Sequence, residues 1–375
     1  MRIIIVTHKL TRTDGQGRVN YELARHAAMS GHAVHLIAEE VAPELREMEG
    51  IDYTLASHGP LRIALLRNFW FGLHAGIILR KLRSAGDVVL LNGAIALGSS
   101  DINAVHFVHR GWGASPFYEA GRGLRGLYQR FYTGLNVVLE RLAFRASRYL
   151  VAVSSQVAGE LVAAGQPPEK IEVIANGVDT LEFSPGTVAR AAYGLPERSV
   201  VALFVGGLGT PRKNLDTVLR ALVEVPDLHL AVVGAHEGTS YPRLAQQLGV
   251  DRRVHFLGFR RDVAAIMRAS DFFVFPSRYE PFGLVVLEAM ASGLPVVTCR
   301  TAGAAELVGE GCGVVVAEPN DVGAVADAMR VVMADLRTSR TMPAQAREVA
   351  EQHDWSRMAG DYLKLCARVA GERGI

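Results

Sequence analysis

PSRYEPFGLVVLEAMASGLPVV, residues 276–297, is the most informative stretch of this chain of 375 residues. Pro281 and Gly283 interrupt regular structure just before 284–291, a run of good helix formers, which predicts a helix that begins near 282–284. The first backbone N–H groups of such a helix have no partner inside it, and the helix dipole adds partial positive charge there. The stretch therefore predicts a loop–helix junction that attracts phosphate.

Two glutamates, Glu280 in the loop and Glu288 in the apolar run, lie eight positions apart in this stretch. A carboxylate on a helix made of Leu, Val, Ala and Met is costly to bury without partners, and sugar hydroxyls are donors that could satisfy it. A phosphate-attracting helix start beside two such carboxylates predicts a nucleotide-sugar site.

This E-x7-E spacing, followed by A-x-A-x-G-x-P-V-V, resembles the donor-site signature of retaining glycosyltransferases of the GT-B type, family four. Three further segments carry the same resemblance: VHFLG at 254–258, AGAAELV at 302–308 and NGVD at 176–179. With the glycines near position 15 and the Arg-Lys pair at 212–213, the resemblance spans nearly the whole chain.

Short apolar runs alternate with helix-length segments along both halves, which predicts βαβ units and parallel sheets. A helix is expected over 19–29. The expected strands are 2–7, 32–38, 87–92, 103–108, 200–205, 228–233, 254–256, 272–275, 296–298 and 314–316.

The predicted fold class is α/β with GT-B architecture, in which two doubly wound Rossmann-like domains face a central cleft. The expected domains are 1–180, on the acceptor side, and 181–354, which holds the donor. The last segment, about 355–375, resembles the family's closing helix, which packs back on the first domain.

The segment GGLGTPRKNL follows the strand expected at 200–205 and begins with Gly206 and Gly207. Transfer from a nucleotide diphosphate requires cations and aimed N–H groups, because negative charge grows on the leaving diphosphate. By resemblance, Lys213 and Arg212 form the diphosphate-binding pair, with Lys213 the closer match. The chain departs from the commoner pattern at Gly207, where many relatives carry an arginine.

The resemblance also implies roles for the other donor-site residues. Glu280 is expected by the hydroxyls of the donor sugar and Glu288 at the ribose, while Glu306 is expected to orient a loop or to pair with an arginine. Gly15 and Gly17 are expected in a glycine-rich loop that closes over the diphosphate, before a helix that begins near Val19. Near the base, the expected contacts are Phe256, Leu257 and Gly258. Near the phosphates, they are Phe282, Gly283 and Leu284.

His109 ends the strand expected at 103–108, at the carboxyl edge of a parallel sheet where ligands gather. It resembles the family's histidine that contacts the donor sugar across the cleft. His106 competes for this role. Residues three apart in a strand point to opposite faces, so at most one of the two is expected to face the cleft. His109 is the favoured residue, and a hydrogen-bonded core position is the alternative for His106.

The chain contains no D-x-D, the usual divalent-metal clamp for a nucleotide diphosphate, so neither a metal nor a cofactor is expected. The resemblance implies retaining transfer of a hexosyl or N-acetylhexosaminyl group, with His109, Glu280, Lys213 and Arg212 as the catalytic set. A UDP-sugar is the favoured donor and a GDP-sugar the second. The expected acceptor is a hydroxyl on a glycan, glycolipid or small molecule, in cell-envelope or glycan biosynthesis.

Two kinds of rival function remain at this point. One is another enzyme on the same architecture, such as a sugar-nucleotide epimerase or a phosphorylase, although no pyridoxal lysine can be identified. The other is a catalytically silent binding subunit of a transferase complex, against which the intact Glu280, Glu288 and Lys213 count.

The composition, with 49% hydrophobic and 21% charged residues, is that of a globular protein. Three cysteines without C-x-x-C spacing argue against a disulfide framework or a zinc site, and a reducing cytosol fits best. The apolar run at the N-terminus is too short for a signal-peptide core. A cytoplasmic protein is expected, either soluble or peripheral at the inner face of the membrane.

Charge is distributed unevenly along the chain. Residues 58–150 contain 12 Lys or Arg and 4 Asp or Glu, a local +8 in a chain whose net charge is +2. The segments 61–83 and 123–148 mix arginines with apolar and aromatic residues, and two interpretations stay open: a docking face for an anionic membrane or lipid-linked acceptor, or helices that pack on the sheet with solvated arginines. Nucleic acid is not expected, because no binding motif accompanies the charge.

Overall fold

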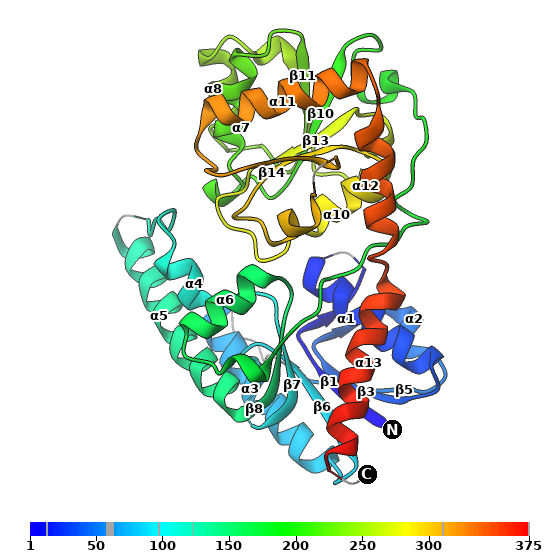
Figure 1. The fold of residues 1–375 in the computed structure, drawn as a ribbon. Coiled ribbons are helices and arrows are strands. Elements are labelled where there is room, and N and C mark those ends of the chain that lie inside the picture. The colour runs from blue at the N-terminus through cyan, green and yellow to red at the C-terminus, as the bar shows by residue number, and fades with distance from the viewer. Residues whose placement is uncertain (13, 58–63, 97, 122, 310, 374–375) are drawn as a thin grey trace. The chain divides into compact units, whose positions relative to one another are not determined.

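The computed structural model describes residues 1–12, 14–57, 64–96, 98–121, 123–309 and 311–373. The chain forms two compact units. Unit 1 comprises 1–177 and 355–375, and unit 2 comprises 178–354. Each unit is an α/β layer structure built on one parallel sheet (Figure 1), as predicted.

Unit 1 contains a seven-stranded parallel sheet in the order β5-β3-β1-β6-β7-β8-β9. Its strands are β1 (Arg2–Val6), β3 (Ala33–Ala38), β5 (Ile51–Leu55), β6 (Asp87–Asn92), β7 (Ser100–Val105), β8 (Ser147–Ala152) and β9 (Ile171–Val173), and a separate two-stranded ladder joins β2 (Lys9–Leu10) to β4 (Glu40–Val41). Its helices are α1 (Gly15–Met29), α2 (Pro43–Arg46), α3 (Ala64–Leu82), α4 (His109–Ala114), α5 (Gly123–Ala146), α6 (Ser155–Ala163), the 3-10 turn η1 (Pro168–Lys170) and α13 (Trp355–Gly371).

The central strands of unit 1 are apolar on both faces because helices cover both. Phe71, Ala75 and Leu79, spaced four apart along α3, pack with Ile4 and Val6 of β1. Helix α13 contacts α1 and β6 (Figure 1), and Trp355 stands under the Arg18 guanidinium at 5.9 Å. A parallel sheet buried in this way requires the continuous apolar strands that the sequence contains.

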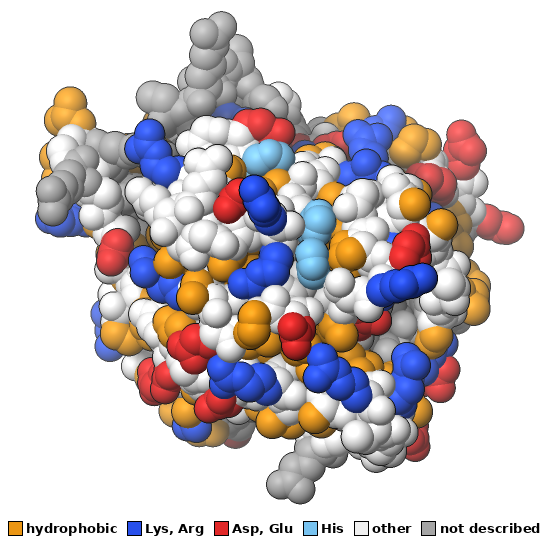
Figure 2. Space-filling model, turned by 90° about the horizontal axis from the view of Figure 1, so that it is seen from above, with side chains coloured by type: hydrophobic (Ala, Val, Ile, Leu, Met, Phe, Trp, Pro, Cys, Tyr) orange, Lys and Arg blue, Asp and Glu red, His pale blue; other side chains and the backbone are white. Residues whose placement is uncertain are grey.

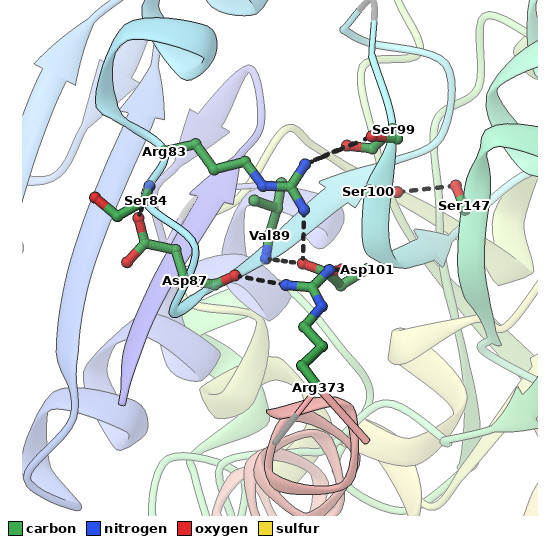
Figure 3. A network of polar contacts seen from close by, with 9 residues as sticks. All are labelled: Arg83, Ser84, Asp87, Val89, Ser99, Ser100, Asp101, Ser147 and Arg373. Carbon is green, nitrogen blue, oxygen red and sulfur yellow. Dashed lines mark hydrogen bonds and ion pairs between the residues drawn. The ribbon is translucent and has the colours of Figure 1, made fainter. Parts of the chain in front are cut away.

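A polar network fixes the residues after α13 to unit 1 (Figure 3). Asp101, 1% exposed, accepts from the backbone N–H of Val89 at 2.8 Å and forms ion pairs with Arg83 and Arg373. Arg373 also donates to the carbonyl of Asp87 at 3.0 Å. The buried carboxylate is therefore held by two cations and an amide, as a charge inside a protein requires.

Unit 2 contains a six-stranded parallel sheet in the order β12-β11-β10-β13-β14-β15, the doubly wound order of dinucleotide-binding folds. Its strands are β10 (Val200–Val205), β11 (Leu228–Val233), β12 (Val254–Gly258), β13 (Phe272–Phe275), β14 (Val296–Cys299) and β15 (Gly313–Val316). Its helices are α7 (Leu215–Val223), α8 (Tyr241–Gln247), α9 (Val263–Arg268), α10 (Leu284–Ala291), α11 (Val322–Arg337) and α12 (Thr341–Glu351), with 3-10 turns η2 (Arg190–Tyr193), η3 (Pro211–Lys213), η4 (Asp251–Arg253) and η5 (Gly303–Leu307).

Unit 1 differs from the sequence-based expectation in strands β5, β8 and β9, which were not expected, and in two elements whose bounds are shifted. The strand expected at 103–108 is β7 at Ser100–Val105, and the helix expected from Val19 begins at Gly15. In the described part of the chain, no helix is both long enough and apolar enough to cross a bilayer.

Candidate active site

Ligands of doubly wound sheets bind at the carboxyl ends of the strands, where the strand order reverses. In unit 2 the order reverses between β10 and β13, and in unit 1 between β1 and β6. The segments that follow these four strands hold most of the predicted site residues.

In unit 2 the reversal brings Lys213, which follows β10, to Glu280, which follows β13. The Lys213 ammonium forms an ion pair with the Glu280 carboxylate, and both side chains are mostly buried, at 17% and 14% exposed. The ammonium also lies 5.2 Å from the ring centre of Phe275. The carboxylate and the aromatic face together fix the position of the ammonium beside the start of α10.

The backbone ties η3 to the segment after β13, which explains how these two residues meet. The carbonyl of Arg212 accepts from the hydroxyl of Ser277 at 3.0 Å and from the N–H of Arg278 at 2.8 Å. Asn214, fully buried with a left-handed backbone (φ 65°), donates to the carbonyls of Pro276 and Pro319. The sequence analysis did not identify Asn214. The one local indication of its role was that asparagine tolerates a left-handed backbone and here directly precedes a helix.

Gly206 and Gly207 lie directly after β10. The Gly206 N–H donates to the Val233 carbonyl at 3.0 Å, and a methyl group built on Gly206 would lie 3.5 Å from the Lys213 side chain. A methyl group built on Gly207 meets no described atom within 4 Å. The position where relatives carry an arginine is thus open in this chain.

Helix α10 starts at Leu284, with Gly283 as its N-cap. Gly283 has φ +95°, which an L side chain rarely adopts, and a methyl group there would approach the Glu280 side chain to 3.1 Å. The carbonyls of Glu280 and Phe282 accept from the N–H groups of Gly303 and Ala304 at 2.8 and 2.7 Å. Backbone hydrogen bonds from η5 therefore fix the loop before α10, with Glu280 next to the start of the helix. The helix begins within the range predicted from the sequence.

The remaining donor-site residues are spread along the sheet edge. Glu288 is half-buried in the second turn of α10, and Phe256, Leu257 and Gly258 end β12, with the Phe256 ring against His236 at 5.1 Å. Two strands separate β12 from β13, so this loop lies on the order of 14 Å from the segment carrying Glu280. The structure therefore brings Lys213, Glu280 and Gly283 together and places the predicted base loop apart from them.

In unit 1 a cavity of about 420 Å³ opens at the carboxyl ends of β1, β6 and β7. Helices α3 and α5 form its walls, and most of its lining is apolar. Its principal lining residues are His8, Gln16, Leu66, Asn68, Phe69, Asn92, His106, Phe107, His109, Tyr132, Leu135, Asn136, Leu139 and Glu140.

His109 is tied to Glu140 of α5 by two hydrogen bonds. Its Nδ1 lies 2.7 Å from Glu140 Oε1, and its backbone N–H donates to Oε2 at 2.9 Å. An ionised carboxylate only accepts, so Nδ1 carries a proton, and in the neutral imidazole Nε2 is then the acceptor. Sequence reasoning missed Glu140, although it is the only acidic residue of 123–146.

The premise that His106 and His109 lie in one strand, from which at most one was expected to face the cleft, is wrong, because neither lies in β7. The strand ends at Val105, His109 opens α4, and both imidazoles line the same cavity. Burial lowers the pKa of His106 to about 4, so this imidazole is neutral. Its Nε2 has no hydrogen-bond partner among the described atoms. This atom therefore does not form the hydrogen bond that the alternative, a hydrogen-bonded core histidine, requires.

The predicted glycine-rich loop is instead the first turn of α1. Asp14 caps the helix by accepting from the Gly17 N–H at 2.7 Å, and a methyl group on Gly17 would lie 2.5 Å from Asp14 Oδ2. Glycine is thus required at 17 by the cap, while Gln16 of the same turn lines the cavity. The Arg18 guanidinium forms an ion pair with Glu22, one turn further along α1, at 2.8 Å.

Among the described residues, no group of three or more His, Cys, Asp or Glu side chains could hold a metal ion. Glu306 lies in η5, directly behind the loop that carries Glu280.

Two family models match the chain. The model described as Glycosyltransferase Family 4 matches residues 13–181, and the model described as Glycosyl transferases group 1 matches residues 199–335. A curated relative, the D-inositol 3-phosphate glycosyltransferase of Mycobacterium tuberculosis, is 33% identical over 246 residues, which are 62% of this chain and 51% of that protein. The chain spans about half the length of the curated relatives it matches.

Solved structures resemble the chain along its whole length. Sucrose-phosphate synthase from Thermosynechococcus elongatus has a TM-score of 0.80 at 21% identity, covering 99% of both chains. WaaG, a glycosyltransferase involved in lipopolysaccharide biosynthesis, has a TM-score of 0.77 at 21% identity, covering 96% of this chain and 98% of its own. HepE of Anabaena, solved with UDP and glucose, has a TM-score of 0.71 at 21% identity, covering 98% and 99%. At these identities the likeness establishes the fold.

Proposed function

Because the chain belongs to glycosyltransferase family 4, with the GT-B fold, we propose that it moves a sugar from a nucleotide-diphosphate sugar to an acceptor hydroxyl. The observation that carries this proposal is the Lys213–Glu280 pair at the strand-order reversal of unit 2, beside the start of α10. It combines a cation for the phosphates, aimed N–H groups and a carboxylate for sugar hydroxyls.

A UDP-sugar is the favoured donor in this proposal, with a GDP-sugar second. HepE of Anabaena was solved with UDP-glucose, and a trehalose-6-phosphate protein of E. coli with UDP-2-fluoro glucose. Both share the fold of this chain, and their ligands support uridine as the base. The donor would lie along the carboxyl edge of the unit 2 sheet, with the base at 256–258, the ribose at Glu288 and the diphosphate at Lys213.

The chemistry we propose is retaining and independent of metal. As the bond between the sugar and the diphosphate lengthens, negative charge grows on the leaving oxygen. Lys213, Arg212 and the N–H groups of Gly283 and Leu284 would stabilise that charge. The leaving phosphate would help to deprotonate the acceptor hydroxyl on the same face of the sugar, so no side chain acts as a nucleophile.

The cavity of unit 1 would receive the acceptor. Its apolar walls and its few polar groups fit a hydroxyl compound carried on a lipid better than a free sugar. His109, with its proton held at Nδ1 by Glu140, would offer Nε2 to a hydroxyl bound in this cavity.

The test is incubation with a panel of nucleotide sugars and a lipid extract, with release of nucleoside diphosphate as the readout. Release with one donor, and its loss in Lys213→Ala, is the expected result. Conversion of the sugar without release would identify an epimerase, and no release with any donor would identify a silent subunit. Configuration at the anomeric carbon of the product, measured by NMR, would then decide between retention and inversion.

A further inference from the structure

Helix α3 has two apolar faces, and the sheet buries only one of them. Phe71, Ala75 and Leu79 point into the core of unit 1. A second series, at spacings of three and four, faces solvent: Leu66, Phe69, Trp70, Leu73 and Ile77 are all exposed. Residues at this spacing lie on one side of a helix, so they form a continuous exposed stripe.

Helix α5 repeats this arrangement. Its buried side carries Glu140 and Phe144. Its outer side carries a stripe of exposed residues, again spaced by three, four or seven: Leu124, Leu127, Tyr128, Phe131, Val138 and Leu142. Among the described residues, half of all exposed large hydrophobic side chains lie on these two helices of 19 and 24 residues. Such a concentration marks an interaction surface, because single exposed apolar residues are normally scattered.

The charges on the same helices are of one sign. Residues 64–82 and 123–146 contain seven Lys or Arg and one acidic residue, Glu140, which is buried against His109. Exposed cations flank the stripes and pair with no described carboxylate: Arg80, Lys81, Arg130, Arg141 and Arg145. By contrast, the face drawn in Figure 2 shows acidic and basic side chains intermixed.

We propose that the outer sides of α3 and α5, here called the α3–α5 face, dock on an anionic lipid bilayer. Apolar and aromatic side chains would enter the interface between headgroups and acyl chains, while the arginines and lysine contact lipid phosphates. This docking proposal rests on the proposed function, and it places the acceptor of the transfer at a membrane surface. The same helices wall the unit 1 cavity, and Leu66 and Phe69 of the exposed stripe also line it, so a docked face would hold the cavity beside a lipid-linked hydroxyl.

A bilayer explains the charge better than a second copy of the chain. Two copies meeting through this face about a two-fold axis would bring the cations of one against those of the other, and no exposed carboxylate of these helices would pair with them. An anionic bilayer supplies the missing counter-charge.

The experiment is sedimentation of the full chain with vesicles, comparing equal parts phosphatidylglycerol and phosphatidylcholine with phosphatidylcholine alone. The stripe variant Trp70→Ser/Ile77→Ser/Phe131→Ser changes exposed residues outside the cavity lining. A matched control, Met29→Ser/Leu181→Ser/Val331→Ser, removes three exposed apolar side chains from other parts of the chain. UDP binding in solution is measured for each variant.

Wild type and control should sediment with the anionic vesicles, and the stripe variant should bind at least about tenfold more weakly while UDP affinity stays unchanged. Binding of the wild type should also weaken as salt rises. The proposal is overturned if wild type binds both vesicles equally, if it binds neither, or if stripe and control variants lose binding alike. If neither the wild type nor either variant binds UDP, the result would instead count against the proposed function.

Discussion

The two glutamates of the E-x7-E motif should respond in opposite directions when UDP binding is measured. In the free protein Glu280 is paired with Lys213, the residue expected to meet the diphosphate. The diphosphate would stand within contact distance of that ammonium, so roughly 7 Å from the carboxylate. Repulsion between two unit charges at that separation, at an effective dielectric constant of about 20 to 40, is ~1–2 kcal/mol. Glu280→Gln should therefore bind UDP about tenfold more tightly, because it removes this repulsion and the competition for Lys213.

Glu288→Gln should weaken UDP binding, because the ribose hydroxyls lose a charged acceptor. Isothermal titration at one fixed salt concentration compares both variants with wild type and with Asp327→Asn, which removes an exposed negative charge from α11. Since the side chains of Lys213 and Glu280 are mostly buried, the gain in Glu280→Gln should persist at raised salt. UDP binding that is unchanged or weaker in Glu280→Gln would refute the assignment of Lys213 to the diphosphate. Turnover should move the other way, with kcat falling in Glu280→Gln and mainly donor KM rising in Glu288→Gln.

Four further outcomes are expected. Lys213→Ala should lower kcat/KM by about 10²- to 10³-fold in steady-state assays, and a folded variant with unchanged rate would end its assignment. Activity should survive excess EDTA, whereas complete loss restored by a divalent metal would show that the phosphate site is misread. Glu140→Gln should lower kcat by about 10- to 100-fold with UDP affinity kept, and ¹⁵N NMR should report loss of the Nδ1–H form of His109; an unaltered tautomer would contradict the positioning role. Asp101→Asn should lower the free energy of unfolding of unit 1 by about 2–4 kcal/mol in urea titrations, while Glu372→Gln, at an exposed ion pair, should cost under about 1 kcal/mol; equal effects would show that the buried network adds nothing.

Most strands of both sheets were predictable, because parallel strands covered on both faces must be continuously apolar. β10, β11, β13 and β6 match the predicted ranges at both ends. β7 does not match, because its first half is polar. Ser100, Asp101 and Asn103 are buried there through partners in other segments of the chain, including the Ser147 hydroxyl at 2.9 Å from that of Ser100. No local pattern reports such partners, so the strand was expected too late in the chain and both histidines were misplaced.

The predicted start of α1 was wrong for a related reason. Two glycines in three residues lower helix propensity, and the expected loop followed from that. The cap by Asp14 and the close approach of Gly17 to it outweigh the propensity. Within the site, the family resemblance assigned Lys213 and Glu280 to one donor site but did not predict that they pair. The pairing of His109 with Glu140 joins residues 31 apart and also needed the structure.

The return of the chain to unit 1 has a consequence for its synthesis. Unit 2 is a continuous segment, 178–354, inserted between the parts of unit 1. On the ribosome, unit 2 can complete its fold before α13 has emerged, whereas the side of α1 and β6 that contacts α13 stays open until then. Unit 1, whose first part is synthesised before unit 2, is therefore completed last, when α13 packs on it. The buried side chains of α13 include Trp355, Tyr362 and Leu365. A nascent chain stalled at Asp354 would display a finished unit 2 beside an unsealed apolar surface, the form on which chaperones and proteases act.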